Sequence, residues 1–145
     1  MKYLGILILV LAALGMAAFY GYKKTDDEST LFVKESIDAM AQAWDSQAFI
    51  SRADPGLVQS MNTHGGVSAL FAEYSKLGKL KSVDCDLINT APMEVASKKY
   101  LAATYHCNAA YEAGPATIAI TVRKGDNQQS WQIYYVKIVG GQSAE

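Results

Sequence analysis

An apolar run opens the sequence. From Tyr3 to Tyr22 there is no charged side chain, and a helix of about twenty residues spans roughly 30 Å, the thickness of a bilayer's hydrocarbon core. Tyrosines stand at both ends of the run, where membrane interfaces favour aromatic rings. We therefore expect residues 1–24 to form a transmembrane signal-anchor. The alternative is a cleaved signal peptide, with Gly15-Met16-Ala17 as a weak small-x-small cleavage site.

Helical periodicity follows a short polar tether at residues 25–30. Asp54-Pro55 is a start signal for a short second helix that ends near Met61, and a third helix continues as far as Gly78. Before these, apolar residues recur at spacings of three and four, which predicts a long first helix. Its stripe comprises Val33, Ile37, Met40, Ala41, Trp44 and Ala48.

After Gly78 the hydrophobic period changes from 3.6 to 2, which predicts strands. The breaks between the strands are short turns, so the connections are antiparallel hairpins. The predicted fold class is therefore α+β, with the transmembrane helix followed by helices packed on one face of a curved, cone-like four-stranded antiparallel sheet. The domain should cover residues 31–139, before a flexible tail at residues 140–145. The four expected strands are Lys79–Thr90, Lys99–Glu112, Ala116–Lys124 and Ser130–Val139.

One choice of buried face satisfies all three hairpins. It pairs Tyr111 with Ile118, and Val122 with Trp131, and it places a β-bulge at residues 135–138. It also puts Cys85 opposite Cys107, near enough for a disulfide. The alternative for the two cysteines is a pair of buried free thiols.

Charge and cysteine usage indicate the compartment. The chain has a formal net charge of −1, all its acidic residues follow Lys24, and no basic stripe is present, so we expect no nucleic-acid partner. Two cysteines, an even number, favour one disulfide and therefore an oxidising compartment. We expect a membrane-anchored, extracytoplasmic domain, on a bacterial inner membrane facing the periplasm. The alternative is secretion after signal-peptide cleavage.

The chain resembles the nuclear-transport-factor-like (cystatin-like) α+β superfamily. The resemblance rests on the stretch Met40–Asp45 (MAQAWD), on a third helix ending in Leu77-Gly78, and on a terminal W-x-I strand that starts at Trp131. It covers residues from Leu31 to Val139 and includes no catalytic signature. The resemblance implies a small exported member. Such members often serve as assembly modules in envelope machines, although the superfamily also contains enzymes similar to ketosteroid isomerases and small dehydratases.

Candidate chemistry is sparse. Asp84 and Asp86 should point away from the core, and neither His64 nor His106 has further metal ligands at a plausible spacing. We therefore expect no catalytic residue, metal site or cofactor. Aromatic side chains could line a cone-shaped cavity for a small apolar ligand, although such sets more often form a core. These candidate cavity residues are Trp44, Phe71, Tyr74, Tyr105, Trp131 and Tyr135.

The other face of the predicted sheet is weakly polar and carries few charges, which suits docking to a partner protein or to itself. The sequence thus favours a non-catalytic interaction or assembly module, an accessory subunit of an envelope complex. A binder of a small apolar ligand is the alternative, and an enzyme of the isomerase or dehydratase type comes last. The candidate partner face consists of Thr104, His106, Thr117, Thr121, Gln132 and Tyr134.

Overall fold

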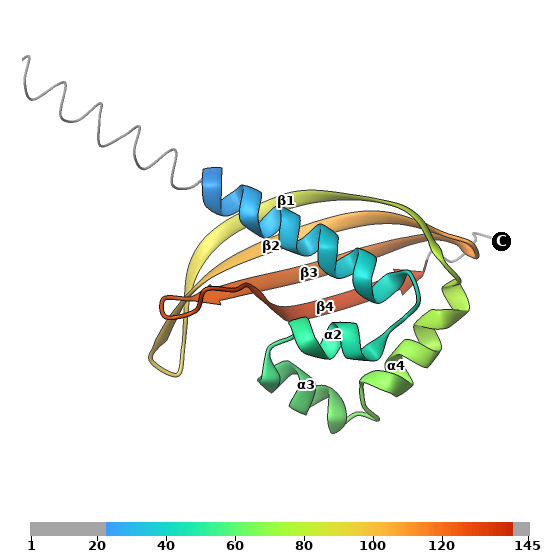
Figure 1. The fold of residues 1–145 in the computed structure, drawn as a ribbon, viewed down its shortest axis with the longest axis horizontal. Coiled ribbons are helices and arrows are strands. Elements are labelled where there is room, and N and C mark those ends of the chain that lie inside the picture. The colour runs from blue at the N-terminus through green and yellow to red at the C-terminus, as the bar shows by residue number, and fades with distance from the viewer. Residues whose placement is uncertain (1–22, 141–145) are drawn as a thin grey trace, which may run out of the picture.

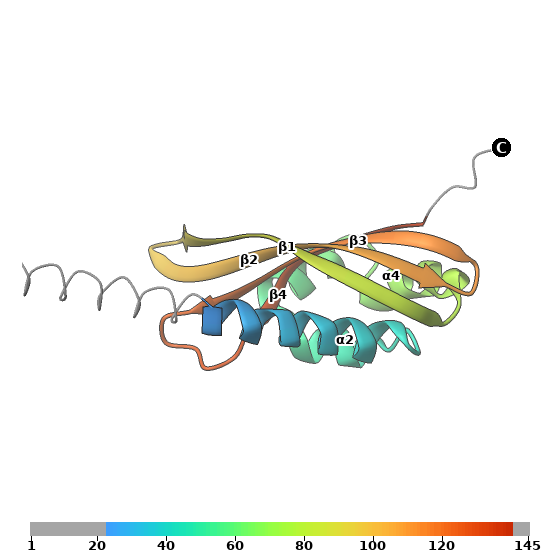
Figure 2. The same cartoon turned by 90° about the horizontal axis from the view of Figure 1, so that it is seen from above.

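The computed structural model describes residues 23–140, which form an α+β fold (Figure 1). The four strands make one antiparallel sheet in the order β1-β2-β3-β4, each paired with its neighbour in the chain. Figure 2 shows the helix over residues 23–41, called the long helix below, on one side of the sheet together with α2. The further elements are α2 (Ser46–Arg52), α3 (Pro55–Asn62), α4 (Val67–Tyr74), a 3-10 turn (Ser75–Leu77), β1 (Leu80–Val95), β2 (Lys98–Tyr111), β3 (Gly114–Gly125) and β4 (Gln132–Gly140).

The predicted fold class needs one correction, because it included a transmembrane helix. The predicted span, residues 3–22, lies outside the described residues, as do residues 141–145 of the expected tail. Within residues 23–140, no helix is long and apolar enough to cross a membrane. The long helix carries charged side chains from Lys23 to Asp38, which are absent from a bilayer-spanning stretch. The corrected class is an α+β fold with a four-stranded antiparallel sheet and no such helix in this part of the chain.

The long helix begins earlier than the sequence pattern predicts. Residues 25–30, expected as a polar tether, are helical. Their polar side chains have partners on the sheet: the Ser29 and Thr30 hydroxyls lie 2.6 and 2.9 Å from the Tyr105 hydroxyl, and the Thr90 hydroxyl donates to the Asp26 carboxylate at 2.8 Å. Ser29 is buried, and its hydroxyl connects the long helix to Tyr105 of the sheet instead of capping a helix end. These contacts fix the first turns of the long helix to β1 and β2.

The sheet registers agree with prediction at the cysteines of the first hairpin and differ from it in the other two hairpins. Cys85 pairs with Cys107, as predicted. In the next hairpin Tyr111 pairs with Gly114 instead of Ile118, because the chain already turns at Glu112 and Ala113. Backbone hydrogen bonds to Lys79 and Leu77 hold this turn: the Glu112 N–H donates to the Lys79 carbonyl, and the Ala113 N–H to the Leu77 carbonyl, both at 3.0 Å.

The β-bulge in the third hairpin lies nearer the start of β4 than predicted. Val122 pairs with Ile133 and Thr121 pairs with Tyr135, so Tyr134 is the extra residue. The bulge reverses the alternation of faces, and Tyr135, expected on the buried face, is 47% exposed. Val136, which is partly buried, and Ile138, which is buried, take over the core-facing positions opposite Ile120 and Ile118.

The disulfide predicted between Cys85 and Cys107 is present. The Cys107 side of the bond is buried, and no free cysteine occurs among residues 23–140. Such bonds persist in oxidising compartments and are rare where glutathione and thioredoxin keep thiols reduced. The disulfide therefore indicates an oxidising, extracytoplasmic environment for this domain.

The β1–β2 hairpin closes through two strained residues. Ala96 and Ser97 have φ of 50° and 62° between the paired residues Val95 and Lys98. Left-handed backbone costs an ordinary L-residue roughly 1–2 kcal/mol, and two-residue turns of this kind favour Asn-Gly.

We expect the double change Ala96→Asn with Ser97→Gly to raise the free energy of unfolding by about 1 kcal/mol in urea titrations. The change Glu112→Asn with Ala113→Gly, at two turn residues that have no positive φ, should bring no gain, and equal effects at the two turns would contradict the assignment of strain.

Candidate interaction surface

The six candidate cavity residues do not surround one cavity. Trp44, Phe71 and Tyr74 form a cluster of aromatic rings at one end of the molecule. The centroid of the Trp44 ring lies 5.9 Å from that of Phe71 and 5.7 Å from that of Tyr74. Trp44 also stacks on Tyr111 at 5.4 Å and donates its indole N–H to the Gly78 carbonyl at 2.9 Å. Burial raises the pKa of Tyr111 to about 12, so this hydroxyl stays protonated. The cluster is core packing between helices and sheet.

The other three candidates lie apart from this cluster. Tyr105 is buried beneath the start of the long helix, where its hydroxyl meets Ser29 and Thr30. Trp131 is buried just before β4, and Tyr135 lies on the opposite face of the sheet. None of the six candidate cavity residues lines the pockets beside the β1–β2 turn, beside Pro92 or beside Val139.

The side chains considered for metal binding or acid–base chemistry lie in simple local surroundings. No group of three His, Cys, Asp or Glu side chains within residues 23–140 could hold a metal ion. The His64 Nδ1 lies 2.9 Å from both the Thr63 hydroxyl and the Ser60 carbonyl, which are local contacts at the end of α3. Asp84 and Asp86 are exposed on β1.

The candidate partner face is assembled by the fold. Strand pairing places five of its residues on the side of the sheet that points away from the long helix, called the outer face below (Figure 2). The bulged Tyr134 has no strand partner, and its ring contacts Arg123 at the border of this face. Thr104 pairs directly with Thr121, and their hydroxyl oxygens lie 3.3 Å apart. His106 and Thr117 are exposed, whereas the other four members are half-buried or partly exposed: Thr104, Thr121, Gln132 and Tyr134.

The middle of the outer face consists mostly of small or weakly polar residues. One row of the strand ladder runs across all four strands from Asp86 through His106 and Ala119 to Lys137. The acidic end of this row is on β1 and the basic end is on β4. The neighbouring rows contribute further small or polar side chains, namely Ala91, Ala102, Thr104, Asn108, Ala110, Thr117 and Thr121.

A buried arginine borders the outer face. The Arg123 guanidinium lies 3.9 Å from the centroid of the Tyr100 ring and 4.2 Å from that of Tyr134, and its Nη2 donates to the Asp54 Oδ2 at 2.8 Å. The side chains of Arg123 and Asp54 are only 7% and 14% exposed. Asp54 also accepts from the Gly56 N–H at 2.9 Å, capping α3, and donates its own N–H to the Ile133 carbonyl. The pair thus joins the helices to β3 and β4.

Sequence reasoning missed this arrangement. Alternation places Arg123 on the outer face and therefore suggests an exposed side chain. Its burial depends on Tyr100, on the bulged Tyr134 and on Asp54, which are far apart in the sequence. The one local signal was Asp54 before Pro55, which indicated a helix cap but not an ion pair.

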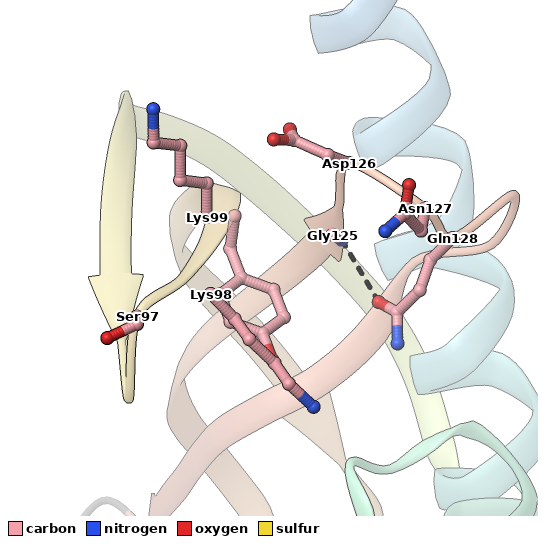
Figure 3. A pocket seen from close by; sticks show the side chains of 8 residues that line it. Ser97, Lys98, Lys99, Gly125, Asp126, Asn127 and Gln128 are labelled. Carbon is pink, nitrogen blue, oxygen red and sulfur yellow. Dashed lines mark hydrogen bonds between the residues drawn. The ribbon is translucent and has the colours of Figure 1, made fainter.

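A pocket lies at the end of the sheet where the β1–β2 turn approaches the β3–β4 loop (Figure 3). Its volume of about 470 Å³ is in the range of small-molecule sites. However, Lys98 and Lys99 extend in different directions, and Asp126 brings the opposite charge, so the lining does not converge on one ligand chemistry. The lining residues are Ser97, Lys98, Lys99, Tyr100, Gly125, Asp126, Asn127 and Gln128.

The free edge of β1 is poorly suited to strand addition. Its register shifts near both Leu80 and Leu87, and Pro92 lacks the N–H that a further strand would need. Asp84 and Asp86 add charge along this edge, another feature that discourages pairing with another chain. Among the described parts of the sheet, the outer face is therefore a better docking surface than this edge.

Comparison with known protein families, curated proteins and solved structures finds no match to this chain.

Proposed function

We propose that this protein is a non-catalytic, extracytoplasmic interaction module and that the outer face docks a protein partner. The observation that carries the proposal is the asymmetry of the sheet. The long helix covers one face, whereas the other face leaves small and weakly polar side chains uncovered within residues 23–140 (Figure 2). Protein interfaces favour surfaces with few charges at their centre and polar groups at their rim, as found between Asp86 and Lys137.

Two further observations support this proposal. The disulfide indicates an environment outside the reducing cytosol. The layout of helices followed by an antiparallel meander also fits the resemblance to the nuclear-transport-factor-like superfamily, whose small exported members often serve as assembly modules. We extend that use to this chain as an accessory subunit of an envelope complex.

Site-specific photo-cross-linking in the native cell tests the proposal. A photoreactive side chain at Thr117, exposed on the outer face, should give a discrete protein adduct, because this surface is in contact with a partner. The same group at Asp38, exposed on the long helix, is the matched control and should give none. Absence of an adduct at Thr117, or equal adducts at both positions, would contradict docking through the outer face.

A further inference from the structure

We propose that the occupant of the outer face is a second copy of this chain, packed face to face about a two-fold axis parallel to the strands. In this dimer Asp86 of each copy lies against Lys137 of the other. The inference rests on the proposed function and identifies the partner that the outer face takes. The arrangement of charges across the sheet favours this partner.

Asp86 and Lys137 are the two ends of one ladder row. Asp86 pairs with His106, His106 with Ala119, and Ala119 with Lys137. Strands about 4.8 Å apart place β1 and β4 roughly 14 Å from each other, beyond the Debye length of about 8 Å at physiological salt. Both side chains are exposed, and neither forms a salt bridge within residues 23–140. The two opposite charges are therefore free to meet partners on another molecule.

A two-fold axis parallel to the strands and between β2 and β3 brings these charges together. The rotation exchanges β1 with β4 and β2 with β3, and it keeps each ladder row in place. Asp86 then faces Lys137 of the second copy, and the symmetry repeats the pair at the other side of the interface. The row from Asp86 to Lys137 is thus complementary to itself in charge.

The other in-plane axis, perpendicular to the strands, is disfavoured. It would place β1 over β1 of the second copy, so that the acidic region around Asp84 and Asp86 would face its own image. Like charges in juxtaposition suppress a docking mode. Charge complementarity therefore selects the axis parallel to the strands.

The size and composition of the outer face are compatible with this dimer. Four strands about 4.8 Å apart and about eight residues long give a projected face of roughly 500 Å² per copy, or about 1,000 Å² in total. This is near the lower limit for a specific interface. Ala102, Ala119 and Thr121 allow two sheets to approach to the usual spacing of about 10 Å. Tyr135 and Val139, 47% and 48% exposed, supply apolar area to be covered.

Charge reversal in the full-length chain tests the inference by sedimentation and light scattering. The wild-type chain should dimerise, whereas Asp86→Lys and Lys137→Asp should each dimerise at least tenfold more weakly, since both contacts in each homodimer become repulsive. An equimolar mixture of these two variants should form heterodimers, because each lysine then meets an aspartate of the other chain. The double variant Asp86→Lys with Lys137→Asp should recover dimerisation, with both pairs reversed.

Reversal of exposed charges on the long helix provides the matched controls. Lys34→Asp and Asp38→Lys should leave the association constant within twofold of wild type, and unfolding curves should show that all variants retain their fold. A monomeric wild-type chain at about 100 μM, or single variants that dimerise as tightly as wild type, or a mixture that does not associate, would each overturn the inference. A Thr117 adduct with a different protein, together with a monomeric chain, would overturn the self-association and leave the proposed function standing.

Discussion

Replacing Asp54 with asparagine should lower the free energy of unfolding by about 3–5 kcal/mol. The change keeps a side chain that can still cap α3, but it removes the negative charge that faces Arg123. Breaking a buried ion pair leaves an uncompensated buried charge, which is the costly step. The Arg123 Nε and Nη1 atoms already lack hydrogen-bond partners among the described residues, so the guanidinium depends on its contact with the Asp54 carboxylate.

Asp45 offers a matched control for this experiment. It caps α2 as Asp54 caps α3, accepting from the Gln47 N–H at 2.9 Å, but it is exposed and faces no cation in the described part of the chain. Urea unfolding should therefore show a cost below about 1 kcal/mol for Asp45→Asn, since asparagine is also a good cap. Adding Arg123→Met to Asp54→Asn should recover part of the lost stability, because the unpaired charge is then gone. Equal losses for the two Asp→Asn variants would show that the ion pair contributes little.

Removing the disulfide should lower the free energy of unfolding by about 3 kcal/mol. Cys85 and Cys107 are separated by 22 residues, and in the chain-entropy model closing a loop of this size restricts the unfolded chain by about that amount. Urea unfolding of the wild-type chain should shift to lower urea after reduction, with thiol labelling to confirm that the bond is open. The double variant Cys85→Ala with Cys107→Ala should unfold near the reduced wild type and should not respond to reductant. A reduced chain with the midpoint of the oxidised one would contradict the expectation.

The change of hydrophobic period and the short turns were enough to predict helices followed by a four-stranded meander. The Cys85–Cys107 pairing was also predictable, because both cysteines lie on the buried side of one hairpin. The β2–β3 register was not, because the chain turns already at Glu112 and Ala113. The β3–β4 register was not, because an inserted residue breaks the alternation on which such reasoning depends. Tyr134 is that residue, and it moved Tyr135 from the expected buried face to the outer face.

The candidate surface was likewise predictable from the sequence only in part. Thr104, His106, Thr117 and Thr121 could be placed on one face because they lie on strands before the bulge, where simple alternation holds. The environment of Arg123 could not be predicted, since it combines an aromatic ring from β2, the bulge of β4 and the cap of α3. The predicted transmembrane segment concerned residues outside the described part of the chain, and the long helix that follows it is too polar to take that role.

The disulfide has a consequence for how two molecules of this chain can combine. It fastens the edge strand β1 to its neighbour β2 through Cys85 and Cys107, so β1 cannot separate from β2 and insert alone into another molecule. Exchange of identical elements is otherwise a low-cost route to dimers. While the bond is intact, β1 alone cannot be exchanged between two molecules, and reductive cleavage would permit that exchange.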